Sequence, residues 1–313
     1  MFEDICNALD WRSVDKITKG WSKDEKYRVV TQQGKTLLLR VSDIKQYDKK
    51  KKEYEMILKY AQLGFLMSFP VDFGICDQGN RVYMLLTWIN GDDLEEVLPE
   101  LPEEKQYLLG REAGKILKKI HSLPVDADDT PADMRKAKKL QQLSCYEQSR
   151  VRINGDEEVI RYMKQNIDQI GKEKMVYLHG DFHPGNMIYT KDDSIGIIDF
   201  NRWKAGGAYE EFYKLESFGT EASIPYCIGQ IDAYFDDHIP EDFWTALSVY
   251  AAHASLYSIK WAENFSQEDV DRMIKRCLRA FDDYDYFTSY IPKWYTDSYR
   301  RSMHSGSAGS IYV

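Results

Sequence analysis

Three oxygen-bearing side chains follow one another in residues 176–200 at a spacing that could do chemistry. Asp181 lies in a turn, Asn186 follows five residues later, and Asp199 ends a short apolar run. Transfer of a phosphoryl group to a hydroxyl uses such a set. One carboxylate orients the hydroxyl and accepts its proton, while an amide and a second carboxylate hold Mg²⁺ against nucleotide phosphates. Order and spacing together favour this chemistry over an accidental run of polar turns.

Short strands and turns are predicted to position these side chains. Residues 175–178 have the composition of a strand, and Gly180 and Pro184 prevent a helix across the motif. Residues 186–189 and 194–198 are predicted to form a hairpin. Asp181 would then lie in a loop, with Asn186 and Asp199 near strand ends that face it.

Three histidines near these elements need an interpretation. His179 and His183 have the spacing of a zinc-binding helix, but Pro184-Gly185 breaks the helix and no Glu follows, so neither is expected to bind a metal. We expect His179 to hold the loop by a hydrogen bond and His183 to pack near the base. His121, at the end of a helix predicted over 104–122, is expected to be a core or capping residue.

The strings HGDFHPGN and IIDF resemble the catalytic and metal-binding motifs of the aminoglycoside phosphotransferase family. That family belongs to the protein-kinase-like fold and has choline, methylthioribose and homoserine kinases as relatives. The resemblance implies that Asp181 is the catalytic base and that Asn186 and Asp199 bind Mg²⁺. It implies ATP as the phosphoryl donor, with GTP as an alternative. The implied fold is α+β and bilobal, with a small β-rich N-terminal lobe (1–89) and a large, mainly helical C-terminal lobe (90–313), whose residues 302–313 have the composition of a loose tail.

The N-terminal lobe contains a candidate nucleotide loop. Strands are predicted at 14–18, 26–31 and 35–41, and the first hairpin contains Gly20 and Ser22. Backbone N–H groups and a small hydroxyl in such a loop can reach phosphate oxygens. On its residues alone the loop fits an ordinary polar hairpin better, and it is the resemblance that assigns Gly20 and Ser22 to the nucleotide.

Arg40 stands where protein kinases carry a lysine that contacts phosphates. Arginine is always charged and can bind phosphate oxygens through two N–H groups, so this departure is compatible with function. The family resemblance makes Glu53, or alternatively Glu55, the ion-pair partner of Arg40 on a helix predicted over 49–63. The four lysines at its start, 49–52, are predicted to be solvated.

The resemblance also places a hinge between the lobes at residues 87–91. In the family, backbone groups of the hinge pair with the edge of the adenine base. The corresponding positions in this chain are Thr87 and Ile89.

The net charge of the chain limits the classes of molecule that it is expected to bind. The 313 residues include 42 basic and 51 acidic side chains, a formal charge of −9, which argues against nucleic acid and favours a cationic small molecule. Between 206 and 242 we count nine carboxylates and one lysine, Lys214. Solvated helix faces explain this excess as well as a cation site does. Glu210 and Glu211, close after Asp199, and Asp232 are the candidate substrate residues.

Cysteine usage and hydropathy indicate a location. Five cysteines, an odd number without a CxxC pair, favour free thiols in a reducing cytosol. The N-terminus lacks the features of a secretory signal, and no apolar stretch approaches the length of a membrane span. We therefore expect a cytoplasmic protein with no membrane partner. Nothing in the sequence indicates an oligomeric state.

Two classes of function remain open. The first is an ATP-dependent kinase that phosphorylates a hydroxyl of an aminoglycoside or similar amino-sugar antibiotic, which would confer antibiotic resistance. Choline, methylthioribose or a sugar are alternative acceptors. The second is a nucleotide-binding pseudokinase. Such proteins typically lose the base or a metal ligand, whereas this chain keeps all three residues.

Overall fold

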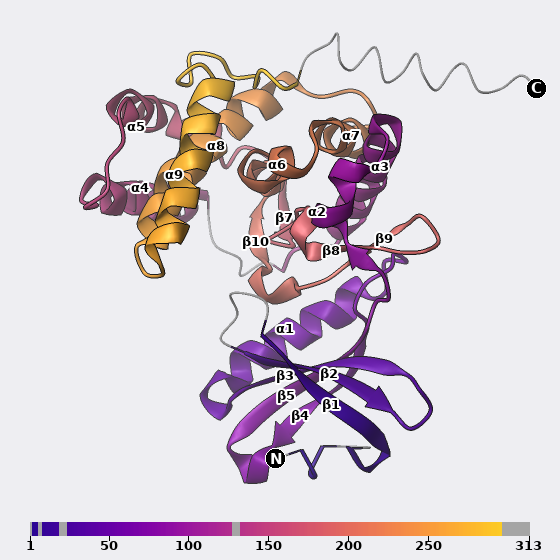
Figure 1. The fold of residues 1–313 in the computed structure, drawn as a ribbon. Coiled ribbons are helices and arrows are strands. Elements are labelled where there is room, and N and C mark those ends of the chain that lie inside the picture. Colours follow the sequence, from indigo (N-terminus) through magenta and orange to yellow (C-terminus); the bar gives the residue numbers. More distant parts are fainter. Residues whose placement is uncertain (1, 6–7, 19–23, 127–131, 296–313) are drawn as a thin grey trace, which may run out of the picture. The chain divides into compact units, whose positions relative to one another are not determined.

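The computed structural model describes residues 2–5, 8–18, 24–126 and 132–295 (Figure 1). The chain forms two compact units. The first comprises Met1–Asp92 and Asn186–Trp203, and the second comprises Asp93–Gly185 and Lys204–Val313. A β-rich N-terminal part and a helical C-terminal part confirm the predicted fold class.

The first unit is built on an antiparallel sheet of five strands in the order β1-β2-β3-β5-β4. The strands are β1 (Trp11–Ile17), β2 (Glu25–Thr31), β3 (Thr36–Asp43), β4 (Pro70–Cys76) and β5 (Arg81–Thr87). Helix α1 (Tyr47–Tyr60) packs against β4 and β5, where the Tyr54 ring stacks on Phe73 at 5.2 Å. Strand side chains on one face form a core that includes Val29, Leu39 and Leu85.

One local prediction for this unit is wrong. The lysines 49–52 were expected to be solvated together, but Lys50 is only 8% exposed. It lies one helical turn before the buried Glu53, and residues three apart share a helix face.

A hairpin from the second half of the sequence belongs to the first unit. Strands β8 (Met187–Tyr189) and β9 (Ile195–Ile197) pair antiparallel. The three-stranded sheet has the order β6-β8-β9, with β6 at Asp92–Asp93. Ile197 N donates to Leu66 O, and Ser68 N donates to Ile197 O. A single boundary after residue 89 does not capture this grouping, because backbone pairing returns residues 186–203 to the N-terminal unit.

The second unit is mainly helical. Its helices are α2 (Leu94–Val97), α3 (Glu103–Ile120), α4 (Ala132–Glu147), α5 (Asp156–Asn166), α6 (Thr220–Ala222), α7 (Ile224–Tyr234), α8 (Glu241–Ala262) and α9 (Gln267–Asp283). Strands β7 (Met175–Leu178) and β10 (Lys204–Gly207) form a two-stranded sheet. Between β10 and α7 lie a 3-10 segment, η8 (Ala208–Phe212), and a π-helix, η9 (Leu215–Gly219).

Close packing between α3 and α7 depends on small residues. A Cβ on Gly110 of α3 would lie 2.1 Å from Tyr226 O, and one on Gly229 of α7 would lie 2.2 Å from Tyr107 O. Neither position can carry a side chain without moving a helix. Elsewhere the core surrounds α8, in which residues 246–253 are all buried, as expected for a helix with neighbours on every side.

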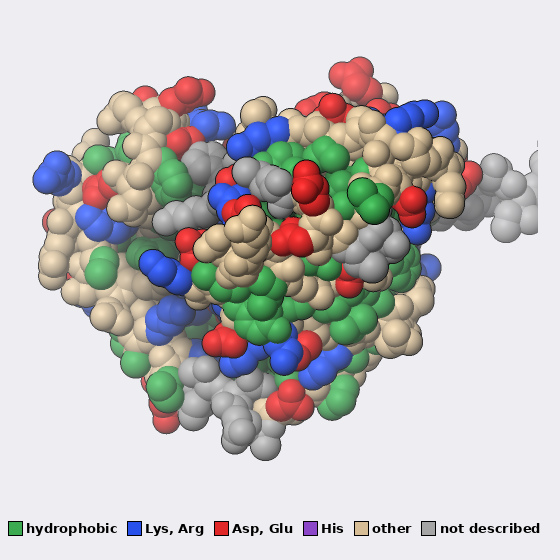
Figure 2. All heavy atoms as spheres, turned by 90° about the horizontal axis from the view of Figure 1, so that it is seen from below, with side chains coloured by type: hydrophobic (Ala, Val, Ile, Leu, Met, Phe, Trp, Pro, Cys, Tyr) green, Lys and Arg blue, Asp and Glu red, His purple; other side chains and the backbone are tan. Residues whose placement is uncertain are grey.

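Among the described helices, none is both long enough and apolar enough to cross a membrane. On the face drawn in Figure 2, basic and acidic side chains are interspersed over the coloured part of the surface.

Candidate active site

Asp181 lies in the loop that follows β7, and a buried carboxylate holds that loop in place. Gly180 N donates to both carboxylate oxygens of Glu211, at 2.9 and 3.2 Å, and Phe182 N lies 3.4 Å from Oε1. Gly180 has a φ of +82°, a conformation that residues with side chains rarely adopt. Amides on both sides of Asp181 therefore converge on one charged acceptor, which fixes the backbone at this point.

Histidines surround the same loop. His179 is buried, and its Nδ1 accepts a hydrogen bond of 3.2 Å from Asp181 N, as predicted. His121 is buried as well, with Nδ1 2.8 Å from the Tyr234 hydroxyl and Nε2 3.8 Å from Glu211. Although burial raises the pKa of Glu211, the neighbouring histidines and the Gly180 N–H hold it below its ordinary value. Glu211 is therefore ionised at neutral pH.

Lys214 and His183 approach the Asp181 carboxylate. Lys214 Nζ lies 2.6 Å from Oδ1, and His183 Nε2 lies 3.6 Å from the same oxygen. Burial lowers the pKa of His183 to about 4, despite the opposing effect of Asp181, so the imidazole is neutral at pH 7. The position of His183 beside Asp181 agrees with the prediction. Lys214 was noted in the sequence only as the single lysine of an acidic segment.

The two predicted metal ligands are neighbours in the first unit. Ile198 N donates to Asn186 O at 3.1 Å across the β8–β9 hairpin, and Asp199 is the next residue. Asp199 has a φ of +62°, uncommon without glycine, and the adjacent Phe200 packs on Tyr60 of α1 at 5.3 Å. Asp199 Oδ1 is buried and accepts no hydrogen bond from the described residues.

An amide and a carboxylate with a buried, unbonded oxygen fit Mg²⁺, which prefers oxygen ligands and keeps several from water or phosphate. Among the described residues, no three His, Cys, Asp or Glu side chains form a metal-binding group. A Mg²⁺ ion at Asn186 and Asp199 would therefore take its remaining ligands from the nucleotide and solvent.

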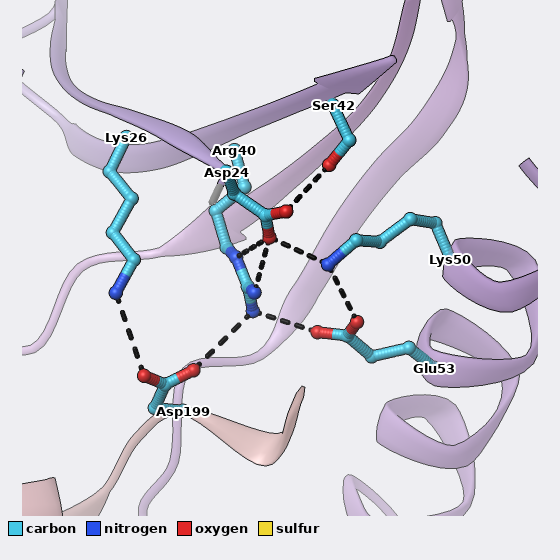
Figure 3. Close-up of polar contacts among 7 residues, drawn as sticks. All are labelled: Asp24, Lys26, Arg40, Ser42, Lys50, Glu53 and Asp199. Carbon is cyan, nitrogen blue, oxygen red and sulfur yellow. Dashed lines mark hydrogen bonds and ion pairs between the residues drawn. The ribbon is translucent and has the colours of Figure 1, made fainter. Parts of the chain in front are cut away.

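Arg40 is the centre of a charge cluster in the first unit (Figure 3). Its Nη1 lies 2.8 Å from Glu53 Oε1 and 3.7 Å from Asp199 Oδ1. Its Nε and Nη2 donate to Asp24 Oδ2 at 3.1 and 2.5 Å. The predicted Arg40–Glu53 ion pair is confirmed, and both residues are buried. Asp24 is an additional partner that the sequence did not reveal.

Two lysines complete this cluster. Lys50 Nζ lies 2.6 Å from Asp24 Oδ2 and 3.0 Å from Glu53 Oε2, and Lys26 Nζ lies 3.5 Å from Asp199 Oδ2. Burial raises the pKa of Asp24, but Arg40 and Lys50 outweigh it and lower the value to about 2. Three cations and three carboxylates thus balance one another around the end of β3.

The remaining predicted nucleotide residues are only partly described. Gly20 and Ser22 lie outside the described residues. Thr87 ends β5, and its hydroxyl accepts from Phe69 N at 2.8 Å, while Ile89 is buried. The assignment of Thr87 and Ile89 to the adenine base stays a prediction.

The three candidate substrate carboxylates are buried, and each has partners inside the second unit. Glu210 accepts from Lys139 and Lys204 at 2.8 and 3.0 Å. Asp232 accepts from the Tyr107 and Tyr295 hydroxyls at 2.9 and 2.7 Å. Glu211 supports the Asp181 loop. Solvated helix faces do not describe these three positions, which have structural roles, and their role in binding substrate stays a prediction.

The β-rich unit contains a buried Arg–Glu pair and a neighbouring Asn and Asp, and the helical unit carries an Asp loop. These features define a kinase-like phosphotransferase. The phosphotransferase enzyme family matches residues 13–246 of the chain. The protein therefore belongs to this family, which confirms the predicted membership. A search of curated protein sequences found no match.

Solved structures show the same fold at low sequence identity. Aminoglycoside 2'-phosphotransferase-IIIa with GDP is 15% identical with a TM-score of 0.66, and the match covers 89% of this chain and 94% of that one. A gentamicin complex of APH(2")-IIa is 17% identical with a TM-score of 0.62 and coverages of 87% and 92%. An amicoumacin kinase with AMP-PNP is 13% identical with a TM-score of 0.61 and coverages of 89% and 90%.

Proposed function

We propose that this protein is a kinase that transfers the γ-phosphoryl group of ATP to a hydroxyl of an amino-sugar antibiotic such as an aminoglycoside. The observation that carries the proposal is the Asp181 loop. Its backbone is fixed by Glu211, and its carboxylate lies beside the neutral His183. A carboxylate held in this way suits the proton acceptor of a phosphotransferase, the family to which the chain belongs.

Each unit has its own part in the proposed reaction. Asp181 orients the acceptor hydroxyl and takes its proton. Arg40, aligned by Glu53, binds phosphate oxygens of the nucleotide, and Asn186 with Asp199 holds Mg²⁺. Bound Mg²⁺ would neutralise charge on the phosphates. Gly20 and Ser22 would contact the phosphates, and backbone groups of Thr87 and Ile89 the base.

Support for the nucleotide and the acceptor comes from similar proteins and from charge. Similar structures contain GDP, ADP or AMP-PNP, so GTP is an alternative donor. Similar proteins were solved with gentamicin, kanamycin and hygromycin B, which favours an amino-sugar acceptor. The net charge of −9 suits a cation. Choline, methylthioribose or a sugar are the alternative acceptors.

The state of the cysteines bears on the cellular location of the protein. The cysteines that the structure describes, Cys76, Cys145, Cys227 and Cys277, are free thiols, which favours a reducing compartment. We therefore place the protein in the cytoplasm, where nucleoside triphosphates are available and where resistance to an imported antibiotic would be exerted.

A substrate screen tests this function. We expect Mg²⁺-dependent release of ADP with at least one aminoglycoside in a panel that also contains a macrolide, choline and methylthioribose. Asp181→Asn should lower kcat by about 10²- to 10⁴-fold, because the proton acceptor is lost, and should change nucleotide affinity only a few-fold. Tight ATP binding without turnover of any acceptor would instead indicate a pseudokinase. Unaltered transfer by Asp181→Asn would remove Asp181 from its role.

A further inference from the structure

Lys214 contacts the Asp181 carboxylate, yet it comes from a segment 33 residues further along the chain. The residue immediately precedes the π-helix η9, and its Nζ lies 2.6 Å from Asp181 Oδ1. Its side chain is only 5% exposed. π-Helices are rare and often occur at functional sites. A buried lysine at the start of such an element, paired with the proposed base, calls for a functional explanation.

Aromatic rings surround the ammonium group. Lys214 Nζ lies 5.1 Å from the centre of the Tyr213 ring and 4.9 Å from that of Phe218. These ring faces attract a cation, but they replace only part of the hydration that the ammonium loses on burial. Asp181 supplies a counter-ion for this charge. In turn, the position of the carboxylate depends on where the Tyr213 and Phe218 rings hold Nζ.

Phe218 connects the same π-helix to the other neighbour of Asp181. The His183 ring stacks on Phe218 with centres 4.5 Å apart and planes 18° apart. On Phe218 also lies the Arg276 guanidinium, at 4.3 Å, whose charge is balanced by Glu221 at 2.6 Å. Helix α9, which carries Arg276, thereby holds η9, and Phe218 of η9 contacts both Lys214 and His183.

We propose that Lys214 is a positioning residue for the proposed phosphoryl transfer. It fixes the rotation of the Asp181 carboxylate and keeps it ionised until the acceptor binds. The acceptor O–H bond then breaks and its proton moves to the carboxylate. The hydroxyl oxygen bonds to the γ-phosphorus as the bond to the leaving nucleoside diphosphate breaks. This inference rests on the proposed function, because the step that Lys214 prepares is the one assigned to Asp181.

The charged and titratable groups around Asp181 support this assignment. His183 is neutral at pH 7, Glu211 is engaged by the loop amides, and Arg276 pairs with Glu221. His179 contributes a ring nitrogen to the backbone of Asp181. Among these groups, Lys214 supplies the positive charge that contacts the carboxylate itself.

Kinetics of three variants give the first test. Lys214→Met keeps the length of the side chain and removes its charge, and we expect kcat to fall by about 10²-fold with the KM for nucleotide within twofold. The acid limb of the pH profile of kcat/KM should move to higher pH, because a carboxylate without a neighbouring cation is protonated more easily. Lys214→Arg should recover part of kcat and return the acid limb towards its original position.

Lys139→Met is the matched control. Lys139 is also a buried lysine paired with a carboxylate, Glu210 at 2.8 Å, and it also lies over an aromatic ring. Its loss should lower Tm without moving the acid limb. A folded Lys214→Met protein with kcat within twofold of the original and an unmoved acid limb would overturn the proposal.

Carboxyl NMR separates this inference from the proposed function. With ¹³C-labelled aspartate, and Asp181→Asn to assign the resonance, the Asp181 carboxyl should titrate at higher pH in Lys214→Met than in the original protein. This measurement needs no turnover. If no acceptor is phosphorylated but the titration moves, the proposed function fails and Lys214 still governs the carboxylate. An unchanged titration would overturn the role of Lys214 whether or not the protein is a kinase.

Discussion

The charge cluster around Arg40 in the first unit and the loop around Asp181 in the second are stabilised in different ways. Around Arg40, two long side chains, Arg40 from β3 and Lys50 from α1, share the carboxylates of Asp24 and Glu53. Around Asp181, the main contacts are backbone amides that donate to Glu211. Side-chain ion pairs can exchange one anion for another, whereas amides held by an internal carboxylate cannot reorient without moving the chain.

This difference matches what each region would have to do. A phosphate-binding region must give up internal anions when the nucleotide arrives. A proton acceptor must stay in one place, because a displacement of about 1 Å can cost about 10²-fold in rate. We therefore infer that the first region exchanges its ion pairs on binding and the second remains fixed. Three experiments examine this comparison.

The largest effect is expected from Glu211→Gln. The amide NH₂ of glutamine cannot accept the Gly180 N–H, so one of the loop contacts is lost. We expect kcat to fall by about 10²-fold and the free energy of unfolding to fall by about 1.5–3 kcal/mol. Steady-state kinetics and urea unfolding measure the two quantities.

Asp156→Asn is the control for Glu211→Gln. Asp156 is another buried carboxylate that accepts a backbone N–H, from Ile153, and also binds Arg152, away from the Asp181 loop. It should lose similar stability and keep its kcat. If Glu211→Gln retains kcat within twofold, the backbone contacts do not fix the base, and the contrast between the two regions disappears.

Asp24→Asn is expected to have a smaller effect, and a favourable one: it should strengthen the binding of ADP. Removal of this internal anion frees Arg40 and Lys50 for phosphates, so the affinity for ADP should rise a few-fold. Without nucleotide the protein should be less stable, because two buried cations lose a counter-ion. Calorimetric titration with ADP measures the affinity, and thermal unfolding with and without ADP measures the stability.

Ser42→Ala serves as the control for Asp24→Asn, since it removes only a neutral contact of 2.8 Å to the same carboxylate. Its affinity for ADP should not change. Weaker binding of ADP to Asp24→Asn would mean that Asp24 is a permanent part of the site. The first region would then be as fixed as the second.

The sequence revealed the residues whose pattern is local. Asp181, Asn186 and Asp199 fall within one short segment, so their spacing indicated a function before any fold was known. Glu53 was identified as the partner of Arg40 through family resemblance. Lys50 was misinterpreted as part of a solvated lysine run, although its position three residues before Glu53 offered a signal.

Residues that act through distant contacts escaped prediction. Lys214 and Glu211 lie about 30 residues after the loop they support, and no periodicity links them to it. Glu211 was identified, but as a substrate residue, because a count of carboxylates does not distinguish a solvated side chain from a buried one. Asp24 was missed because its partners come from two other elements, β3 and α1, and no local pattern links them to it.

The smallest effect at neutral pH is expected from His183→Gln. This variant tests how well the region around Asp181 is shielded from solvent. Its pKa is lowered to about 4 in the folded state, against about 6.5 in the unfolded chain. Between these values the unfolded chain binds a proton that the folded protein does not, so stability is full above pH 6.5 and falls as the pH drops towards 4. The loss should reach about 2.5 kcal/mol near pH 4.5. His183→Gln should remove this slope from the unfolding free energy measured between pH 7 and 4.5, while the exposed His238→Gln keeps it. An equal slope in His183→Gln and the original protein would mean that solvent reaches His183 in the folded state, and that the surroundings of Asp181 are less enclosed than its contacts indicate.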